Sequence, residues 1–249
     1  EKYYACKCLS NATIQSKNHN HFANAAADLV GEAFLLSKLS HPNIIRLYGV
    51  TEGQVDQAFQ KTGGFFLIME ALTSVLDDMI QVWRKDSVSS MGDFLLKSNE
   101  SVPDIDERLT IAIEVAKGMQ YLHSNRIIFR DLKPHNVGID REGQVRLFDF
   151  GLARECPSGV CNGKAGSFRY MAPETFNNKF CCFGSDVYAF GITLWELVSL
   201  VRPTKWNCPE DIEQAVCEQG YRPDLNCIED PTVSHLMESC WNEDYQQRP

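Results

Sequence analysis

The run of residues 129–136, Phe-Arg-Asp-Leu-Lys-Pro-His-Asn, carries side chains suited to moving a phosphoryl group. Phosphoryl transfer requires metal ligands, a cation on the phosphates and a carboxylate directed at the incoming hydroxyl. Asp131 offers the carboxylate, Lys133 the cation and Asn136 an amide oxygen of the kind that Mg²⁺ accepts. Taken alone the run is a weak signal, because clusters of surface charge are common.

A second segment, Asp149-Phe150-Gly151, begins 13 residues after Asn136. The alternation of residues 145–147 predicts a strand that leads to Asp149, so its carboxylate stands at the edge of the strand with a flexible glycine behind it. An isolated D-x-G is more often a simple turn. At this spacing, however, the two segments together match the catalytic loop and the metal-binding segment of protein kinases.

The chain is thus similar to eukaryotic protein kinases over essentially its whole length. The resemblance implies that Asp131, Lys133 and Asn136 act in catalysis and that Asn136 and Asp149 bind Mg²⁺. Phe129 replaces the histidine usual before Arg-Asp in this family, and we expect it to fill a packing position at little catalytic cost. ATP and Mg²⁺ are the implied cofactors, and proteins are the implied substrates.

Two further residues are assigned to the nucleotide by the same resemblance. Tyr4-Ala5-Cys6-Lys7 is similar to the family's V-A-I-K strand, which makes Lys7 the candidate for holding the α- and β-phosphates. Glu32 stands nine residues before His41-Pro42-Asn43, where the family's helix glutamate usually lies, and would pair with Lys7. In isolation each of the two would be read as an ordinary surface residue.

The resemblance also assigns residues to the hinge and to structural or regulatory positions. The hinge that contacts adenine corresponds to Met69, Glu70, Ala71 and Leu72, with Met69 as gatekeeper. Leu36, Leu47, Phe129 and Phe150 would form an apolar stack, with Gly151 behind it; Glu174 would pair with Arg248, and Asp186 would brace the catalytic-loop backbone. Arg130 could meet a phosphate in the activation segment, residues 149–174, where Ser158 is the candidate regulatory site and Ser167 is read as structural.

The identity of the acceptor hydroxyl rests on mixed signals. Lys133, two residues after Asp131, follows the serine/threonine pattern, and Ser167 agrees with it. The runs 185–191 and 240–249 resemble the tyrosine-kinase side of the family instead. This mixture is typical of the tyrosine-kinase-like group, most of whose members phosphorylate serine or threonine, and we expect this specificity.

The elements that must position these residues follow from hydrophobic spacing. We expect strands over residues 2–9, 44–50 and 65–69, a polar loop over 10–21 and a helix over 22–39. A second polar loop is expected over 85–104, a helix over 105–124 and, over 187–198, a helix apolar on all sides that must be buried and that Ser185 would cap. The expected class is α+β, a two-lobed kinase fold with a small β-rich lobe at 1–70 and a larger helical lobe at 71–249.

Composition restricts the remaining possibilities. The net charge of −9 argues against a nucleic-acid binder, and no apolar run is long enough to span a membrane. The ten cysteines, among them the Cys156/Cys161 pair, lack metal-binding clusters and are expected to be reduced thiols of a protein, or of the part of a larger protein, that lies in the cytoplasm. An upstream activating kinase is a further partner that the activation segment allows.

The ends of the chain depart from the family pattern. No glycine precedes Lys7 and the chain ends at Pro249, so the resemblance implies a domain without the first two strands, the glycine-rich loop and the final helix. A pseudokinase or ATP-binding scaffold is therefore the alternative function. An unrelated binding domain would have to reproduce all of these motifs, in order, by chance.

Overall fold

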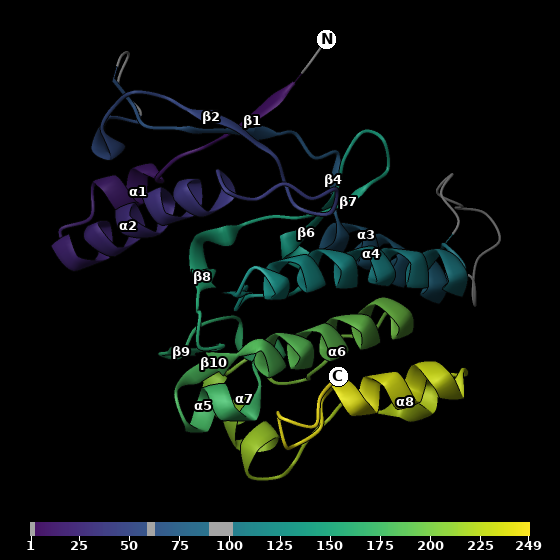
Figure 1. The fold of residues 1–249 in the computed structure, drawn as a ribbon. Coiled ribbons are helices and arrows are strands. Elements are labelled where there is room, and N and C mark those ends of the chain that lie inside the picture. The colour runs from purple at the N-terminus through teal and green to yellow at the C-terminus, as the bar shows by residue number, and fades with distance from the viewer. Residues whose placement is uncertain (1–2, 59–62, 90–101) are drawn as a thin grey trace.

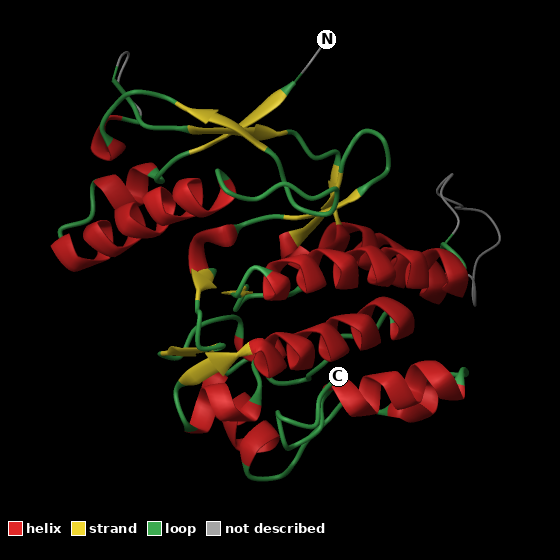
Figure 2. Cartoon of the chain, viewed as in Figure 1, coloured by secondary structure: helices red, strands yellow, loops and turns green. Residues whose placement is uncertain are grey.

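The computed structural model describes residues 3–58, 63–89 and 102–249. A small sheet with two helices beneath it forms the first part of the chain, and helices with short strands between them form the rest (Figures 1 and 2). The small N-terminal sheets and the helical C-terminal portion agree with the expected α+β class, and they are consistent with a kinase fold. Within the described ranges, no helix combines the length and apolar character needed to cross a bilayer.

The first sheet consists of three antiparallel strands in the order β1-β3-β2. They are β1 (Tyr4–Lys7), β2 (Leu47–Val50) and β3 (Leu67–Glu70), each shorter than or shifted from the strand expected there. Leu67 and Met69 of the central strand β3 are buried, as a period of two requires when one face of a sheet covers a core. The register places Lys7 opposite Leu67, at the end of the edge strand β1.

The polar stretch expected as a loop over residues 10–21 is largely helical, and that prediction was wrong. Helix α1 (Asn11–Ile14) is followed by α2 (His19–Leu36), whose first N–H groups donate to the Oδ1 atom of Asn18 at 3.1 and 3.2 Å. An asparagine in this position satisfies N–H groups that the helix itself cannot. This cap starts the helix earlier than the apolar spacing indicated, and the helix also ends three residues earlier than expected.

Helix α4 (Ile105–Ser124) has the bounds predicted from its apolar spacing. A capping box fixes its start, because Asp104 Oδ1 accepts from Glu107 N at 2.9 Å and Glu107 accepts from Asp104 N at 3.3 Å. Helix α3 (Leu76–Ser89) continues into the first residues of the stretch expected as a loop over 85–104, and residues 90–101 of that stretch lie outside the described ranges.

Helix α6 (Phe183–Ser199) is the buried centre of the helical portion, as predicted from its apolar composition. It packs between α4 and α8 (Pro231–Cys240), with α5 (Pro173–Asn177) and α7 (Pro209–Cys217) at one end (Figure 1). Ser185 does not occupy the cap position proposed for it. The cap is Cys182, and Ser185 lies inside the first turn, where its Oγ accepts from Cys182 N at 3.1 Å.

Short strand pairs hold the segments between the helices. The order β4-β6-β7 joins β4 (Ser74–Val75), β6 (Val137–Ile139) and β7 (Val145–Leu147), while β5 (Ile127–Ile128) pairs with β8 (Arg154–Glu155) and β9 (Val160–Asn162) with β10 (Phe180–Cys182). Single 3₁₀ turns are η1 (Val55–Gln57), η2 (Pro134–Asn136), η3 (Phe150–Leu152), η4 (Phe168–Tyr170) and η5 (Leu225–Cys227). Residues 129–136 therefore follow β5 directly and lead into β6, and Asp149 follows the predicted strand β7.

One pair of cysteines departs from the expected reduced state. Cys156 and Cys161 form a disulfide, with Cα atoms 6.0 Å apart. The spacing of the two residues offered no metal partner and so favoured free thiols, but the turn between them brings their Cα atoms within the range that a disulfide spans.

Candidate active site

A single ammonium group joins three separate parts of the fold. Lys7 Nζ on β1 lies 2.6 Å from Glu32 Oε2 on α2 and 2.6 Å from Asp149 Oδ1 after β7. The side chain of Glu32 is 1% exposed, whereas that of Asp149 is 48% exposed and lines a cavity. Lys7 therefore connects a buried carboxylate to one that remains accessible to a ligand.

Burial and the neighbouring charges act in opposite directions on the pKa values of this cluster. Burial alone would lower the pKa of Lys7, but the Glu32 and Asp149 carboxylates outweigh it and raise the pKa. Burial raises the pKa of Glu32, and the attraction of Lys7 offsets this only in part. Lys7 is thus held firmly as a cation, and the charge on Glu32 is maintained at a desolvation cost.

The turn η3 places Asp149 by holding an unfavourable backbone conformation. Asp149 has φ +62°, in the left-handed region that costs a non-glycine residue about 1–2 kcal/mol. Two contacts hold the turn: Phe150 N donates to Glu32 Oε1 at 3.2 Å, and the fully buried Phe150 ring lies 5.0 Å from that of Phe129. A side chain at Gly151 would meet Asp149 Oδ1 at 3.6 Å, an ordinary contact, so space alone does not require glycine there.

The apolar residues expected to stack in the core are in one cluster. Leu36, Phe129 and Phe150 are buried in the main core, and Leu47 is partly buried against it. Phe129 occupies a packing position, as expected for its replacement of histidine. The stack thereby links α2 and the small sheet to the segments that carry the polar site residues.

Asp131 is the centre of a compact polar cluster. Asp131 Oδ2 lies 2.7 Å from Lys133 Nζ, and Oδ1 accepts from Ser167 Oγ at 2.7 Å. Lys133 Nζ also donates to Ser167 Oγ at 2.7 Å, which closes a triangle of three side chains. Because both carboxylate oxygens are hydrogen-bonded, the orientation of the carboxylate is fixed before any substrate arrives.

Asn136 connects this cluster to the segment that carries Asp149. Asn136 Nδ2 donates to the backbone and to the carboxylate of Asp131, at 2.8 and 3.0 Å. Since the amide nitrogen is committed to Asp131, the amide oxygen is the atom left to face a cation. The backbone N–H of Phe148 donates to Asn136 O at 3.0 Å, so the residue before Asp149 is tied directly to the catalytic loop.

Asp186 supports the catalytic loop from the first turn of α6. Its carboxylate accepts from the backbone N–H groups of Phe129 and Arg130, both at 2.8 Å, and lies 2.9 Å from His123 Nε2. These bonds hold Arg130 at φ +71°. The part played by His123 was not found from the sequence, because a histidine in the last turn of a helix gives no signal of a partner 63 positions away.

Within the described part of the chain, no hydrogen bond or ion pair joins Arg130 to Ser158. The buried Arg130 Nε has no hydrogen-bond partner among the described residues. Ser158 is exposed, and its Oγ donates to Val160 O at 3.1 Å within the turn between β8 and β9. A phosphate-binding role of Arg130 therefore stays a prediction.

A buried ion pair closes the end of the activation segment. Arg248 Nη1 lies 2.8 Å from Glu174 Oε1, and Nη2 donates to Oε2 at 3.1 Å. Ser185 Oγ adds a bond to Glu174 Oε1 at 2.7 Å, and Arg248 Nη1 donates to Gly184 O at 2.9 Å. The fork-on-fork geometry and the added bonds satisfy the charges of two buried side chains.

The cavity beside Lys7 and Asp149 has a volume of about 500 Å³ and lies between the small sheet and the catalytic segments. Ala5, Met69 and Leu72 provide apolar wall, which suits the flat ring of a base. Ala71 follows β3 in the same segment and is half-buried.

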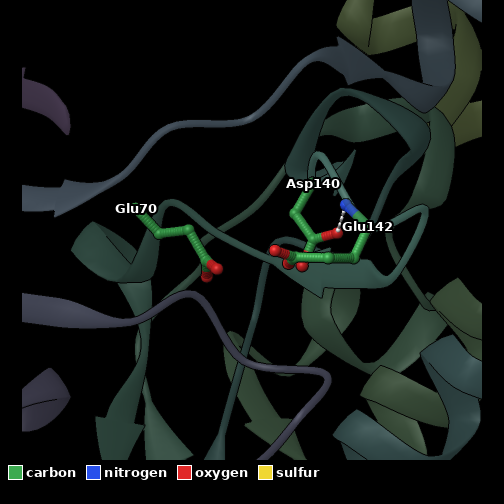
Figure 3. Close-up of side chains that lie close together, drawn as sticks. All are labelled: Glu70, Asp140 and Glu142. Atoms are coloured by element: carbon green, nitrogen blue, oxygen red, sulfur yellow. Dashed lines mark hydrogen bonds between the residues drawn. The ribbon is translucent and has the colours of Figure 1, made fainter. Parts of the chain in front are cut away.

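Figure 3 shows the side chain of Glu70 directed toward Asp140 and Glu142. The acidic charge there is offset, because Arg146 Nη2 lies 3.2 Å from Glu70 Oε1 and 2.7 Å from Asp140 Oδ2. Asp140 Oδ1 accepts from Glu142 N at 2.9 Å, which is the role of an aspartate in a turn. Of the four residues assigned to the hinge, Glu70 therefore directs its side chain into a largely buried ion-pair network with Arg146 and Asp140.

Comparison with known proteins identifies the family. Residues 7–249 match the family described as protein tyrosine and serine/threonine kinase. The chain belongs to this protein kinase family.

The kinase chain is similar to several plant kinases. It is 32% identical over 219 residues to the serine/threonine-protein kinase STY17 of Arabidopsis thaliana, which covers 88% of this chain and 34% of that protein. It is 33% identical over 224 residues to the serine/threonine/tyrosine-protein kinase HT1 of the same plant, covering 88% of this chain and 50% of that protein. The serine/threonine-protein kinase CTR1 is 31% identical over 251 residues, 98% of this chain and 27% of that protein. The chain thus spans half or less of the length of these relatives.

The donors at the kinase site fit the cofactors that the family implies. Asp149 offers an exposed carboxylate and Asn136 an amide oxygen, both hard ligands of the kind that Mg²⁺ binds. Lys7 provides a cation at the edge of a cavity with apolar walls. When bound, Mg²⁺ would neutralise charge on the phosphates.

Proposed function

We propose that this chain is a catalytic region of a protein kinase that transfers the γ-phosphoryl group of ATP to serine and threonine hydroxyls of proteins. The observation that carries the proposal is the triangle of Asp131, Lys133 and Ser167, with all three edges at 2.7 Å. A lysine held beside the aspartate can neutralise a phosphoryl group that arrives there. The serine/threonine-protein kinases among the relatives support the same specificity.

In this proposal each residue has a distinct task. Lys7 binds the α- and β-phosphates, and Glu32 keeps Lys7 oriented. Asp131 orients the acceptor hydroxyl and accepts its proton, while Lys133 offsets the charge on the transferred group. Asn136 and Asp149 hold the metal, and Met69 to Leu72 contact the base.

The proposal includes an arrangement of two lobes, with residues 1–70 in the smaller and 71–249 in the larger. The nucleotide cavity is lined from both, by Lys7 and Met69 on one side and Leu72 and Asp149 on the other. We further propose a cytoplasmic setting, protein substrates and an upstream kinase that acts on the activation segment, where Ser158 is exposed.

The test compares two substitutions that make the same chemical change. Asp131→Asn should lower the rate of phosphate transfer to a serine- or threonine-containing peptide by about 10²–10⁴-fold, the usual contribution of a positioned general base. Asp106→Asn, on the exposed first turn of α4, is the matched control and should leave the rate unchanged. Mg-ATP should raise the melting temperature of the wild type and of both variants, because binding to the folded state stabilises it.

Three results would decide against the proposal. Equal transfer by Asp131→Asn and wild type would remove Asp131 from the reaction. Transfer to a matched tyrosine peptide alone would overturn the specificity. Thermal stabilisation of the wild type by Mg-ATP without transfer to any of the peptides would favour a nucleotide-binding scaffold.

A further inference from the structure

Three cysteine side chains, from the segments around β9 and β10, pack together. Cys156 and Cys161 are joined by a disulfide, and Cys181 faces Cys161 across the antiparallel pair of β9 and β10. Cys156 and Cys181 are buried together with Ile128, while Cys161 is only half-buried against them. Of the two disulfide-bonded residues, Cys161 is therefore the more exposed and Cys156 the more protected.

The disulfide links two separate strand pairs. On one side, Cys156 directly follows β8, and its backbone N–H donates to Arg126 O at 2.7 Å beside β5. On the other side, Cys161 is the middle residue of β9, which pairs with β10. The cross-link thus joins the β5–β8 pair to the β9–β10 pair, in addition to the backbone hydrogen bonds within each pair.

Both ends of this link lead to the Asp131 cluster. Strand β5 continues into the loop that carries Arg130 and Asp131. After β9 the chain reaches Gly166, where a Cβ atom would lie 2.4 Å from Arg130 O, so the two backbones are in close contact. The next residue is Ser167, which bonds Asp131 at 2.7 Å. A covalent bond at Cys161 therefore restrains the chain six residues before a hydroxyl that orients Asp131.

The link has the properties of a reversible bond rather than of a structural cross-link. The two cysteines are only five positions apart in the sequence, and a disulfide that closes a short loop stabilises the folded protein least. Opening it therefore frees a local segment and leaves the large core intact. Cys161 is a half-buried residue, so a small thiol has to approach the bond from its side, and accessible disulfides are the labile ones.

We propose that Cys156 and Cys161 form a reversible redox modification site whose oxidised state holds the activation segment against the Asp131 cluster. The oxidant is a low-molecular-weight disulfide. The Cys161 thiolate attacks one sulfur of that disulfide, forming a mixed disulfide and releasing one thiol; the Cys156 thiolate then attacks Cys161 and releases the second thiol. Two electrons pass from the cysteines to the small disulfide, and the two cysteine protons end on the released thiols.

The consequence for phosphate transfer rests on the proposed function, whereas the redox site does not. Reduction removes the covalent restraint before Ser167, so we expect kcat to fall by about 3- to 10-fold, as for a modest loss of orientation. The KM for ATP should stay the same, because Lys7, Glu32 and Asp149 lie outside the disulfide-linked segment.

The test uses the full chain equilibrated with glutathione and glutathione disulfide at several ratios. Free thiols are alkylated, and linked peptides are identified by mass spectrometry. The Cys156–Cys161 pair should convert fully between the dithiol and the disulfide as the ratio changes, and dithiothreitol should return it to the dithiol. Amide hydrogen exchange over residues 157–166 should be faster in the reduced protein. The Cys161→Ser variant should show the amide hydrogen exchange of the reduced protein at every glutathione ratio. Cys227 is an exposed cysteine elsewhere in the chain, and the Cys227→Ser variant should behave like the wild type.

The outcomes separate the two proposals. A pair that stays reduced in excess glutathione disulfide, a Cys161–Cys181 linkage in place of Cys156–Cys161, or hydrogen exchange that is the same in both states would overturn the redox site. Conversion of the pair in a protein that transfers no phosphate in either state would overturn the proposed function and leave the redox site standing.

Discussion

Ser167 donates its hydroxyl to Asp131 Oδ1 at 2.7 Å, although the two residues lie 36 positions apart. Lys133 Nζ bonds both of them, so the serine determines where the aspartate and the lysine stand relative to each other. The side chain that orients Asp131 thus comes from the activation segment, which makes the geometry of the catalytic loop depend on how that segment is held.

Ser167→Ala should therefore lower kcat by about tenfold, the effect of losing roughly one hydrogen bond to a charged group. Ser167→Thr keeps the hydroxyl and should retain most of the rate. The KM for ATP should stay constant in both variants, because the nucleotide cavity lies at Lys7 and Asp149. Steady-state kinetics with varied ATP check this, and equal loss in the alanine and threonine variants would contradict it.

Glu32→Gln should separate activity from stability. Burial raises the pKa of Glu32, so the charged carboxylate carries a desolvation cost in the folded protein, and glutamine supplies a neutral side chain of the same shape without that cost. Lys7 keeps Asp149 as a partner at 2.6 Å. We expect kcat/KM for ATP to fall by roughly 10- to 100-fold through loss of orientation.

The free energy of unfolding of this variant should not fall together with its activity, and the pH dependence of that free energy provides the check. The free energy of unfolding of the Glu32→Gln variant, measured with urea at pH 7, should equal or exceed that of the wild type. As the pH falls toward the raised pKa, Glu32 takes up its proton in the folded state, so the difference should narrow. A variant markedly less stable than the wild type at pH 7 would show that the charge itself holds the fold.

Arg248→Met should be among the most destabilising substitutions. The Arg248 side chain is fully buried and its partner Glu174 is 4% exposed, so the substitution leaves a buried carboxylate without its cation. Breaking such a pair costs about 3–5 kcal/mol. Arg248→Lys should recover only part of this, because an ammonium cannot bond both carboxylate oxygens as the guanidinium does.

The control for this substitution is an exposed ion pair. Glu155→Gln removes a partner of Lys38 in a pair that is about half exposed, and it should change the free energy of unfolding by about 1 kcal/mol or less. Urea titrations of the variants check the contrast. If Arg248→Met and Glu155→Gln lowered the free energy of unfolding by similar amounts, burial would not control the strength of these ion pairs.

Tyr188 should make the protein less stable at alkaline pH. Burial raises its pKa to about 12 from the ordinary value of 10. Below pH 10 the phenol is neutral in both states; above it the unfolded chain loses the proton and the folded protein keeps it, so stability falls as the pH rises. The slope is about 1.4 kcal/mol per pH unit between these values. Urea titrations at pH 9 and pH 11 should show this fall for the wild type, and Tyr188→Phe should reduce it by about that slope over one unit; an equal fall in both proteins would contradict it.

The sequence by itself determined the residue types of the site and the family. Asp131, Lys133 and Asn136 lie within six residues, and Asp149 follows at a fixed spacing, so their pattern could be read along the chain. The comparisons confirm the kinase family. Helix α4 was also predicted in full, because its apolar period is a local pattern of the sequence.

The tertiary structure decided how these residues are held. His123 reaches Asp186 across 63 positions and Ser167 reaches Asp131 across 36, distances over which spacing carries no information. The start of α2 depended on one capping side chain, which apolar spacing does not record. The Cys156–Cys161 disulfide required the turn that brings the two Cα atoms to 6.0 Å. Local patterns specify which groups are present, and only the path of the folded chain brings distant groups into contact.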